Sequence, residues 1–112
     1  MSFHAEGSKL IMTRGDYGIP IPIRVKQHCE RCRDNLLDDD QIILQVHRGP
    51  CVKVERSITW SELRANEGVM ELSLTKAESD SLPLGVYYWR VVWYRPDEIC
   101  NTLFRSVLEV EV

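Results

Sequence analysis

The stretch Leu82–Tyr94, which reads LPLGVYYWRVVWY, indicates the fold of this chain most directly. Pro83 and Gly85 interrupt the chain, and a run of aromatic and β-branched residues follows, which are the residue types that strands favour. A polar turn at residues 95–98 leads to a second run, from about Thr102 to Val112, in which apolar and charged residues alternate. Two such runs joined by a polar turn predict a β-hairpin at the end of an all-β domain.

Upstream of this hairpin, short alternating runs separated by turns predict further strands, over residues 9–13, 19–25, 41–47, 51–55 and 69–74. Thr75-Lys76-Ala77-Glu78 fits a capping box, so a short helical turn is expected over about residues 76–81. Arg56–Asn66 has no clear period, although Ile58, Trp60 and Leu63 are expected anchors. The pattern predicts a β-sandwich of about seven strands with one helical turn. Residues 1–8 are expected to form a flexible arm before a single domain at 9–112.

Composition excludes several classes of function. The 112 residues suit one domain, 44% of them are apolar, and no apolar run approaches the roughly 20 residues that span a bilayer. The formal charge of −3 disfavours nucleic acid and anionic membranes as partners. The N-terminus lacks the basic and apolar regions of a secretory signal. The three histidines are scattered, and no G-x-S-x-G elbow or glycine-rich phosphate loop is present. We therefore expect no enzyme, no cofactor and no small-molecule substrate.

Cys29-x-x-Cys32 is the sharpest chemical signal in the sequence, because two thiolates at this spacing can hold one side of a tetrahedral zinc ion. In a sandwich, the loop after the second strand and the final hairpin loop lie at the same end, so Cys100 could approach this pair, with His28 as a fourth ligand. Cys51 follows a turn at the opposite end. Unligated thiols in a reducing compartment are the default interpretation, and a zinc site and a disulfide or redox role are the alternatives.

Two other motifs have simpler explanations than binding. The acidic run Asp38–Asp40, with Glu30 and Asp34 nearby, lacks the spacing of an EF-hand, so a solvated loop is favoured over a calcium site. Arg14-Gly15-Asp16 matches an integrin-binding tripeptide, but glycine and aspartate are also the residues that a turn requires.

The strand within Leu82–Tyr94 also predicts a surface. Alternation directs Tyr87, Trp89, Val91 and Trp93 inward. The alternate residues of this strand point to its other face and form an apolar stripe around one arginine. They are Val86, Tyr88, Arg90, Val92 and Tyr94. A stripe of this composition is more typical of a protein interface than of a sugar-binding cleft.

Several motifs recur in a distinctive order: MTRGD at 12–16, DQIILQV at 40–46, LTKAE at 74–78 and LPLGVYYW at 82–89. In this order they resemble small immunoglobulin-like structural domains of tailed phages and prophages, such as the N-terminal domain of the upper baseplate protein. Gly85-x-Tyr87-x-Trp89 is similar to the start of an immunoglobulin F strand, where a tyrosine closes a corner. The chain departs from the family at Arg90, where an aspartate is common, and in its longer loop with two cysteines.

The resemblance implies an immunoglobulin-like β-sandwich and a non-enzymatic role as a tail or baseplate-type assembly subunit. The expected partners are other virion proteins and further copies of the same chain. The expected location is the virion, assembled in the bacterial cytoplasm. The alternative is a bacterial adhesion or carbohydrate-binding β-sandwich module, which would need an export route.

Overall fold

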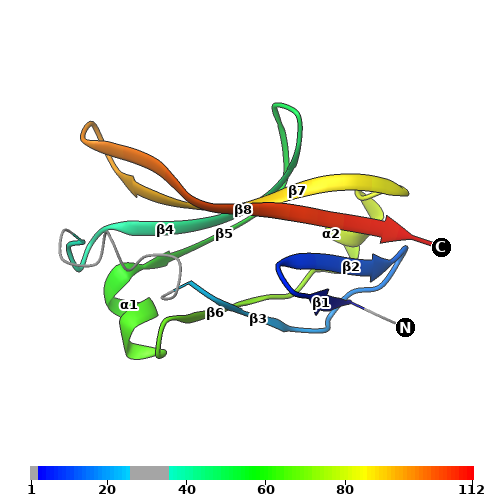
Figure 1. Ribbon diagram of the computed structural model, residues 1–112, viewed down its shortest axis with the longest axis horizontal. Coiled ribbons are helices and arrows are strands. Elements are labelled where there is room, and N and C mark those ends of the chain that lie inside the picture. The colour runs from blue at the N-terminus through cyan, green and yellow to red at the C-terminus, as the bar shows by residue number, and fades with distance from the viewer. Residues whose placement is uncertain (1–2, 26–35) are drawn as a thin grey trace.

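The computed structural model describes residues 3–25 and 36–112, and this part of the chain forms eight strands in two sheets and two short helices (Figure 1). The strands are β1 (His4–Glu6), β2 (Lys9–Thr13), β3 (Ile21–Arg24), β4 (Gln41–Arg48), β5 (Cys51–Thr59), β6 (Val69–Leu72), β7 (Gly85–Arg95) and β8 (Ile99–Glu111). The helices are α1 (Trp60–Ala65) and α2 (Lys76–Asp80). The predicted predominance of strands in two layers is confirmed.

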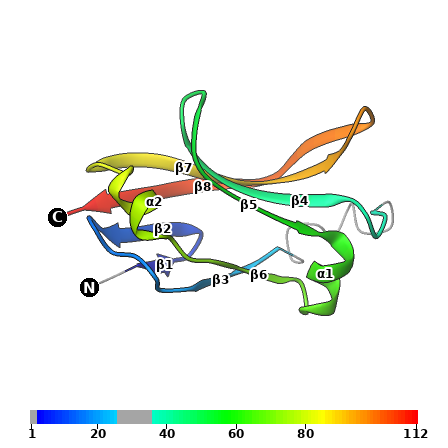
Figure 2. The same ribbon diagram turned by 180° about the vertical axis from the view of Figure 1, so that it is seen from behind.

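The larger sheet has six strands in the order β1-β2-β8-β7-β4-β5. Within it β2 pairs with β8 in parallel, and all other neighbours are antiparallel. The smaller sheet is the antiparallel pair β3-β6, which lies below one face of the larger sheet (Figures 1 and 2). The α1 helix joins β5 to β6 at one end of the molecule, and α2 joins β6 to β7 near the other.

The core lies between the two sheets and follows the predicted alternation. In β7 the four residues expected to point inward are buried, and so are Leu108 and Val110 in β8. Ile42, Leu44 and Val46 are fully buried on β4, and Met70, Leu72 and Leu74 cover them from the β6 side of the core. The α2 helix follows the predicted capping box, because Thr75 Oγ1 accepts from the Glu78 amide at 3.2 Å.

The chain before Lys9 differs from the prediction of an arm. His4–Glu6 forms β1, which pairs with β2 through a turn at Gly7, and Phe3 is buried in the core. All three strand residues are exposed, so no alternation of apolar and polar residues marks this strand in the sequence. Within β1 itself the backbone pairs with β2 while the side chains are exposed, and a sequence pattern does not reveal such pairing.

The segment with no clear period, Arg56–Asn66, contains the end of β5 and the helix α1. Thr59 caps this helix, and Glu62 completes a capping box, so the signal T-x-x-E was present in the sequence. Trp60 and Leu63 are buried, as expected of anchors.

Two predicted inward positions are wrong. Residues 51–55 predict Val52 and Val54 on one face, but a register shift between Val46 and His47 inserts one extra residue in β5 and leaves Val52 exposed beside His47. The alternation in the last run predicts Val112 inward with Leu108 and Val110, but Val112 lies beyond the last pair of β8 and is almost fully exposed, because no strand continues opposite it.

Candidate functional site

One face of the six-stranded sheet covers the core, whereas no other layer of the described residues lies against the opposite face (Figures 1 and 2). The tips of the β4-β5 and β7-β8 hairpins both bend toward this uncovered side. We call it the open face, and it comprises the outward residues of β4, β5, β7 and β8. Because a sheet face without a second layer leaves its side chains available to a partner, the open face is the candidate site.

Strand register brings the predicted stripe of β7 into cross-strand rows on the open face. Tyr88 lies between His47 of β4 and Val107 of β8, and Arg90 lies between Gln45 and Arg105. Val92 lies between Ile43 and Thr102, and Tyr94 lies between Gln41 and Cys100. These pairings join residues that are distant in sequence into one surface.

The exposed fractions show which members of the stripe a partner could touch. Val86 is 48% exposed, Tyr88 44% and Tyr94 37%, and Arg90 is partly exposed. Val92 also points to the open face, but it is only 6% exposed. It is a small side chain in the middle of the sheet, flanked by Ile43 and Thr102 on the neighbouring strands. The accessible stripe therefore has an interruption at Val92.

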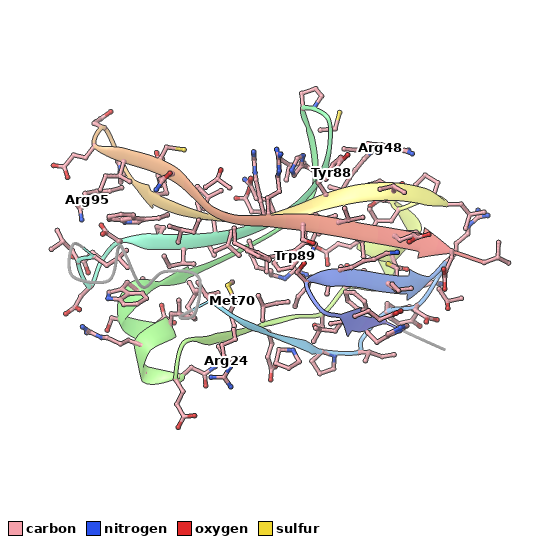
Figure 3. All side chains as sticks on the ribbon, in the orientation of Figure 1. Arg24, Arg48, Met70, Tyr88, Trp89 and Arg95 are labelled. Atoms are coloured by element: carbon pink, nitrogen blue, oxygen red, sulfur yellow. The ribbon has the colours of Figure 1, made fainter. Side chains whose placement is uncertain are left out.

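Polar contacts orient the centre of the open face. Gln45 Nε2 donates to Glu55 Oε2 at 2.9 Å, and Gln45 Oε1 accepts from Arg90 Nε at 2.8 Å. The Arg105 guanidinium carbon lies 6.0 Å from the centre of the Tyr88 ring, a distance at the limit of a cation–π contact. Tyr88 stands at the base of the β4-β5 tip in Figure 3. This arrangement holds two arginines and one tyrosine together on the surface.

His47 closes this row from the β4 side. Its ring centre lies 6.0 Å from that of Tyr88, and its Nδ1 lies 3.1 Å from the Gly49 carbonyl oxygen, which can only accept. Nδ1 therefore carries the proton in this contact. His47 Nε2 is buried without a hydrogen-bond partner among the described residues.

Asp40, at the entry to β4, ties the β7-β8 hairpin to β4 from the core side of the sheet. Its carboxylate accepts from Trp93 Nε1 at 2.9 Å, from Arg95 Nε and Nη2 at 2.7 and 2.6 Å, and from the Leu37 amide at 2.9 Å. Asp40 is only 3% exposed, and hydrogen bonding from the Arg95 guanidinium lowers its pKa to about 2. The expectation of a solvated acidic loop is wrong for this residue, because Trp93 and Arg95, which follow it by more than fifty positions, enclose it.

A second set of contacts holds the start of β7. The Tyr87 hydroxyl donates to the Pro83 carbonyl four residues upstream, at 2.8 Å. The Arg48 guanidinium carbon lies 4.8 Å from the centre of the same ring, and Figure 3 shows Arg48 beside this strand. Tyr87 therefore closes a corner between the α2 connection and β7.

The candidate metal ligands His28, Cys29 and Cys32 lie outside the described residues. Cys100 and Cys51 are both exposed free thiols. Within residues 3–25 and 36–112, no group of three or more histidine, cysteine or acidic side chains is placed to hold a metal ion.

A hollow of about 350 Å³ lies beside Trp89, between the β1-β2 hairpin and β3. Trp89 Nε1 donates to the Ser8 carbonyl at 3.1 Å, and Figure 3 shows Trp89 between the two layers. Arg24 is the one ionisable side chain among the described residues that line this hollow. General acid–base catalysis would require a positioned proton donor or acceptor there, and the described lining offers no carboxylate or imidazole for that role.

No protein-family model, no curated protein and no solved structure matches this chain. Among the described residues, no helix has the length and apolar character needed to cross a bilayer.

Proposed function

We propose that this chain is an immunoglobulin-like structural subunit of a tailed-phage or prophage particle, and that it docks other virion proteins without catalysis. The strand order supports the immunoglobulin-like part of the proposal. In this proposal β3 and β6 correspond to strands B and E of one sheet, and β4, β7 and β8 to strands C, F and G of the other, because β3 pairs with β6 and the order β8-β7-β4 is that of G, F and C. The Tyr87 corner on β7 supports the same assignment.

The motifs that carry the phage resemblance occupy structural positions that give them physical roles. The turn at Arg14–Asp16 follows β2, where the Arg14 amide donates to the Glu111 carbonyl at 2.8 Å. Asp40, the first residue of DQIILQV, is the buried carboxylate that holds Trp93 and Arg95. The LTKAE motif is the capped start of α2. These roles support a resemblance of fold, and the virion assignment rests on the resemblance itself.

The observation that carries the docking function is the exposure of Val86, Tyr88 and Tyr94 on the open face. Tyrosine is enriched at protein interfaces, because its ring buries a large apolar area while its hydroxyl still finds a hydrogen-bond partner. Repetition of a weak contact by the symmetry of a particle would multiply its strength.

The first experiment is to sequence the DNA that flanks this reading frame. Neighbours that encode tail, portal or capsid proteins support the proposal, whereas neighbours for secretion or polysaccharide handling contradict it and favour the adhesion alternative. The chain is then co-expressed with the neighbouring virion proteins, and its presence in purified particles is measured.

In this assay the double variant Tyr88→Ala/Tyr94→Ala is expected to be lost from the particles, because it removes the two exposed rings of the open face. The matched control is Tyr17→Ala, which removes an exposed tyrosine from the loop between β2 and β3. Equal incorporation of the double variant and the wild type would show that the open face is not the docking surface.

A further inference from the structure

Arg90 and Arg105 stand directly opposite each other on neighbouring strands of the open face. Two like charges in this relation repel, so the pair opposes folding rather than supporting it. The chain as a whole is acidic, with a net charge of −3, so this pair is a local concentration of positive charge. Two like charges that destabilise the fold and face solvent are typical of a site that binds a ligand of opposite charge.

The contacts of the two side chains leave most of their donors available. Arg90 uses Nε for Gln45, and its two Nη groups have no partner in the described part of the chain. Arg105 lies near the Tyr88 ring and makes no hydrogen bond or ion pair with any described residue. Gln45, in turn, is held by Glu55, so Arg90 is oriented by a chain of two hydrogen bonds. The site is therefore partly preorganised before any ligand arrives.

We propose that Arg90 and Arg105 form an anion-binding site that receives carboxylate side chains from an acidic segment of a protein partner. Guanidinium groups bind carboxylates through paired hydrogen bonds, and the Tyr88 ring beside them offers apolar cover for the rest of the segment. This inference rests on the proposed function, because it names the chemistry of the partner that docks on the open face.

The charges around the site favour an acidic peptide segment over nucleic acid. Glu55 lies across Gln45 from Arg90, and Glu111 occupies the same side of the sheet farther along β8, beyond Glu109, whose carboxylate is ion-paired with Lys9. A long polyphosphate backbone that reached the two arginines would also pass near these carboxylates and be repelled. A short segment with two or three carboxylates can contact the arginine pair alone.

The test measures binding of a fluorescently labelled triglutamate peptide to the full chain by anisotropy, at about 20 mM and about 150 mM salt. The variants are Arg90→Gln, Arg105→Gln and the double variant. Arg24→Gln is the matched control, because Arg24 is exposed on β3 in the other layer, as Figure 3 shows.

We expect saturable binding that weakens with salt, a loss of about threefold to fivefold in affinity for each single variant, and no change for Arg24→Gln. Equal affinity in all variants, or no saturable binding by the wild type, would overturn the inference. A single-stranded DNA oligonucleotide that binds more tightly through the same arginines would also overturn it, since the ligand would then be nucleic acid.

Thermal unfolding separates a binding role from a structural one. Because the pair is repulsive, Arg105→Gln should raise the Tm of the unbound protein by about 1–5 °C. A clear fall in Tm would mean that Arg105 supports the fold, and would contradict the inference. In the particle assay, loss of the tyrosine double variant together with normal incorporation of the arginine double variant would refute this inference alone, and the docking function would stand.

Discussion

Substitution of Asp40 by asparagine is expected to destabilise the protein through a buried charge. The Asp40 carboxylate holds Trp93 and Arg95 at the end of the β7-β8 hairpin. Its pKa is about 2 in the folded protein against an ordinary value of 3.8. At about 1.4 kcal/mol for each unit of pKa, the ionised form adds roughly 2 kcal/mol to the free energy of unfolding at neutral pH.

Asparagine is similar in shape but carries no charge, and its NH2 group replaces one oxygen that accepts. In the place of Oδ1 the NH2 group would face the donor Arg95 Nε, and in the place of Oδ2 it would face the donors Arg95 Nη2, Trp93 Nε1 and the Leu37 amide. We therefore expect Asp40→Asn to lower the free energy of unfolding by about 2–3 kcal/mol at pH 7. The measurement is urea denaturation followed by circular dichroism. The matched control is Asp38→Asn, which alters an exposed ion pair with Arg64 and should leave the free energy nearly unchanged.

The pH dependence tests the electrostatic reasoning directly. Because the pKa of Asp40 is lowered on folding, its contribution is complete above about pH 5 and is lost as the pH falls toward 2. The gap in stability between the wild type and Asp40→Asn should therefore stay constant from pH 7 to 5 and shrink below pH 4. Hydrogen bonding from Arg56 also lowers the pKa of Glu78 to about 2. Glu78 is present in both proteins, so its effect on stability cancels in the difference between them. A gap that stays the same down to pH 2 would refute the argument.

Two further substitutions test the corner at the start of β7. Tyr87→Phe removes the hydrogen bond to the Pro83 carbonyl and should lower the free energy of unfolding by about 1 kcal/mol, measured by urea denaturation. No change would mean that this bond adds nothing to stability. Gly85→Ala should lower the Tm, because Gly85 has a φ of +141°, which is strained for a residue with a Cβ; the nearest atom to that Cβ, Arg48 Nη2 at 2.7 Å, is the end of a flexible side chain that can move away. An unchanged Tm in calorimetry would contradict the strain.

The outward-pointing residues of β7 are the part of the candidate site that could be predicted from the sequence. Alternation placed Tyr88 and Tyr94 on the surface, and both are exposed there. Alternation did not reveal that Val92 is buried, because the exposure of a small side chain depends on its neighbours on β4 and β8. It also did not reveal that Arg105 stands opposite Arg90, since the register of β8 shifts by one residue between Val91 and Val92.

Local chemistry alone determined the strands other than β1, most of their inward positions and the capped start of α2. Strand period and capping are properties of a few consecutive residues, so the sequence expresses them without knowledge of the rest of the chain. The contacts of Asp40 with Trp93 and Arg95, the pairing of β1 and the uncovered sheet face were decided only by tertiary structure. They depend on which strands become neighbours and in which register, and the packing of the whole chain determines both.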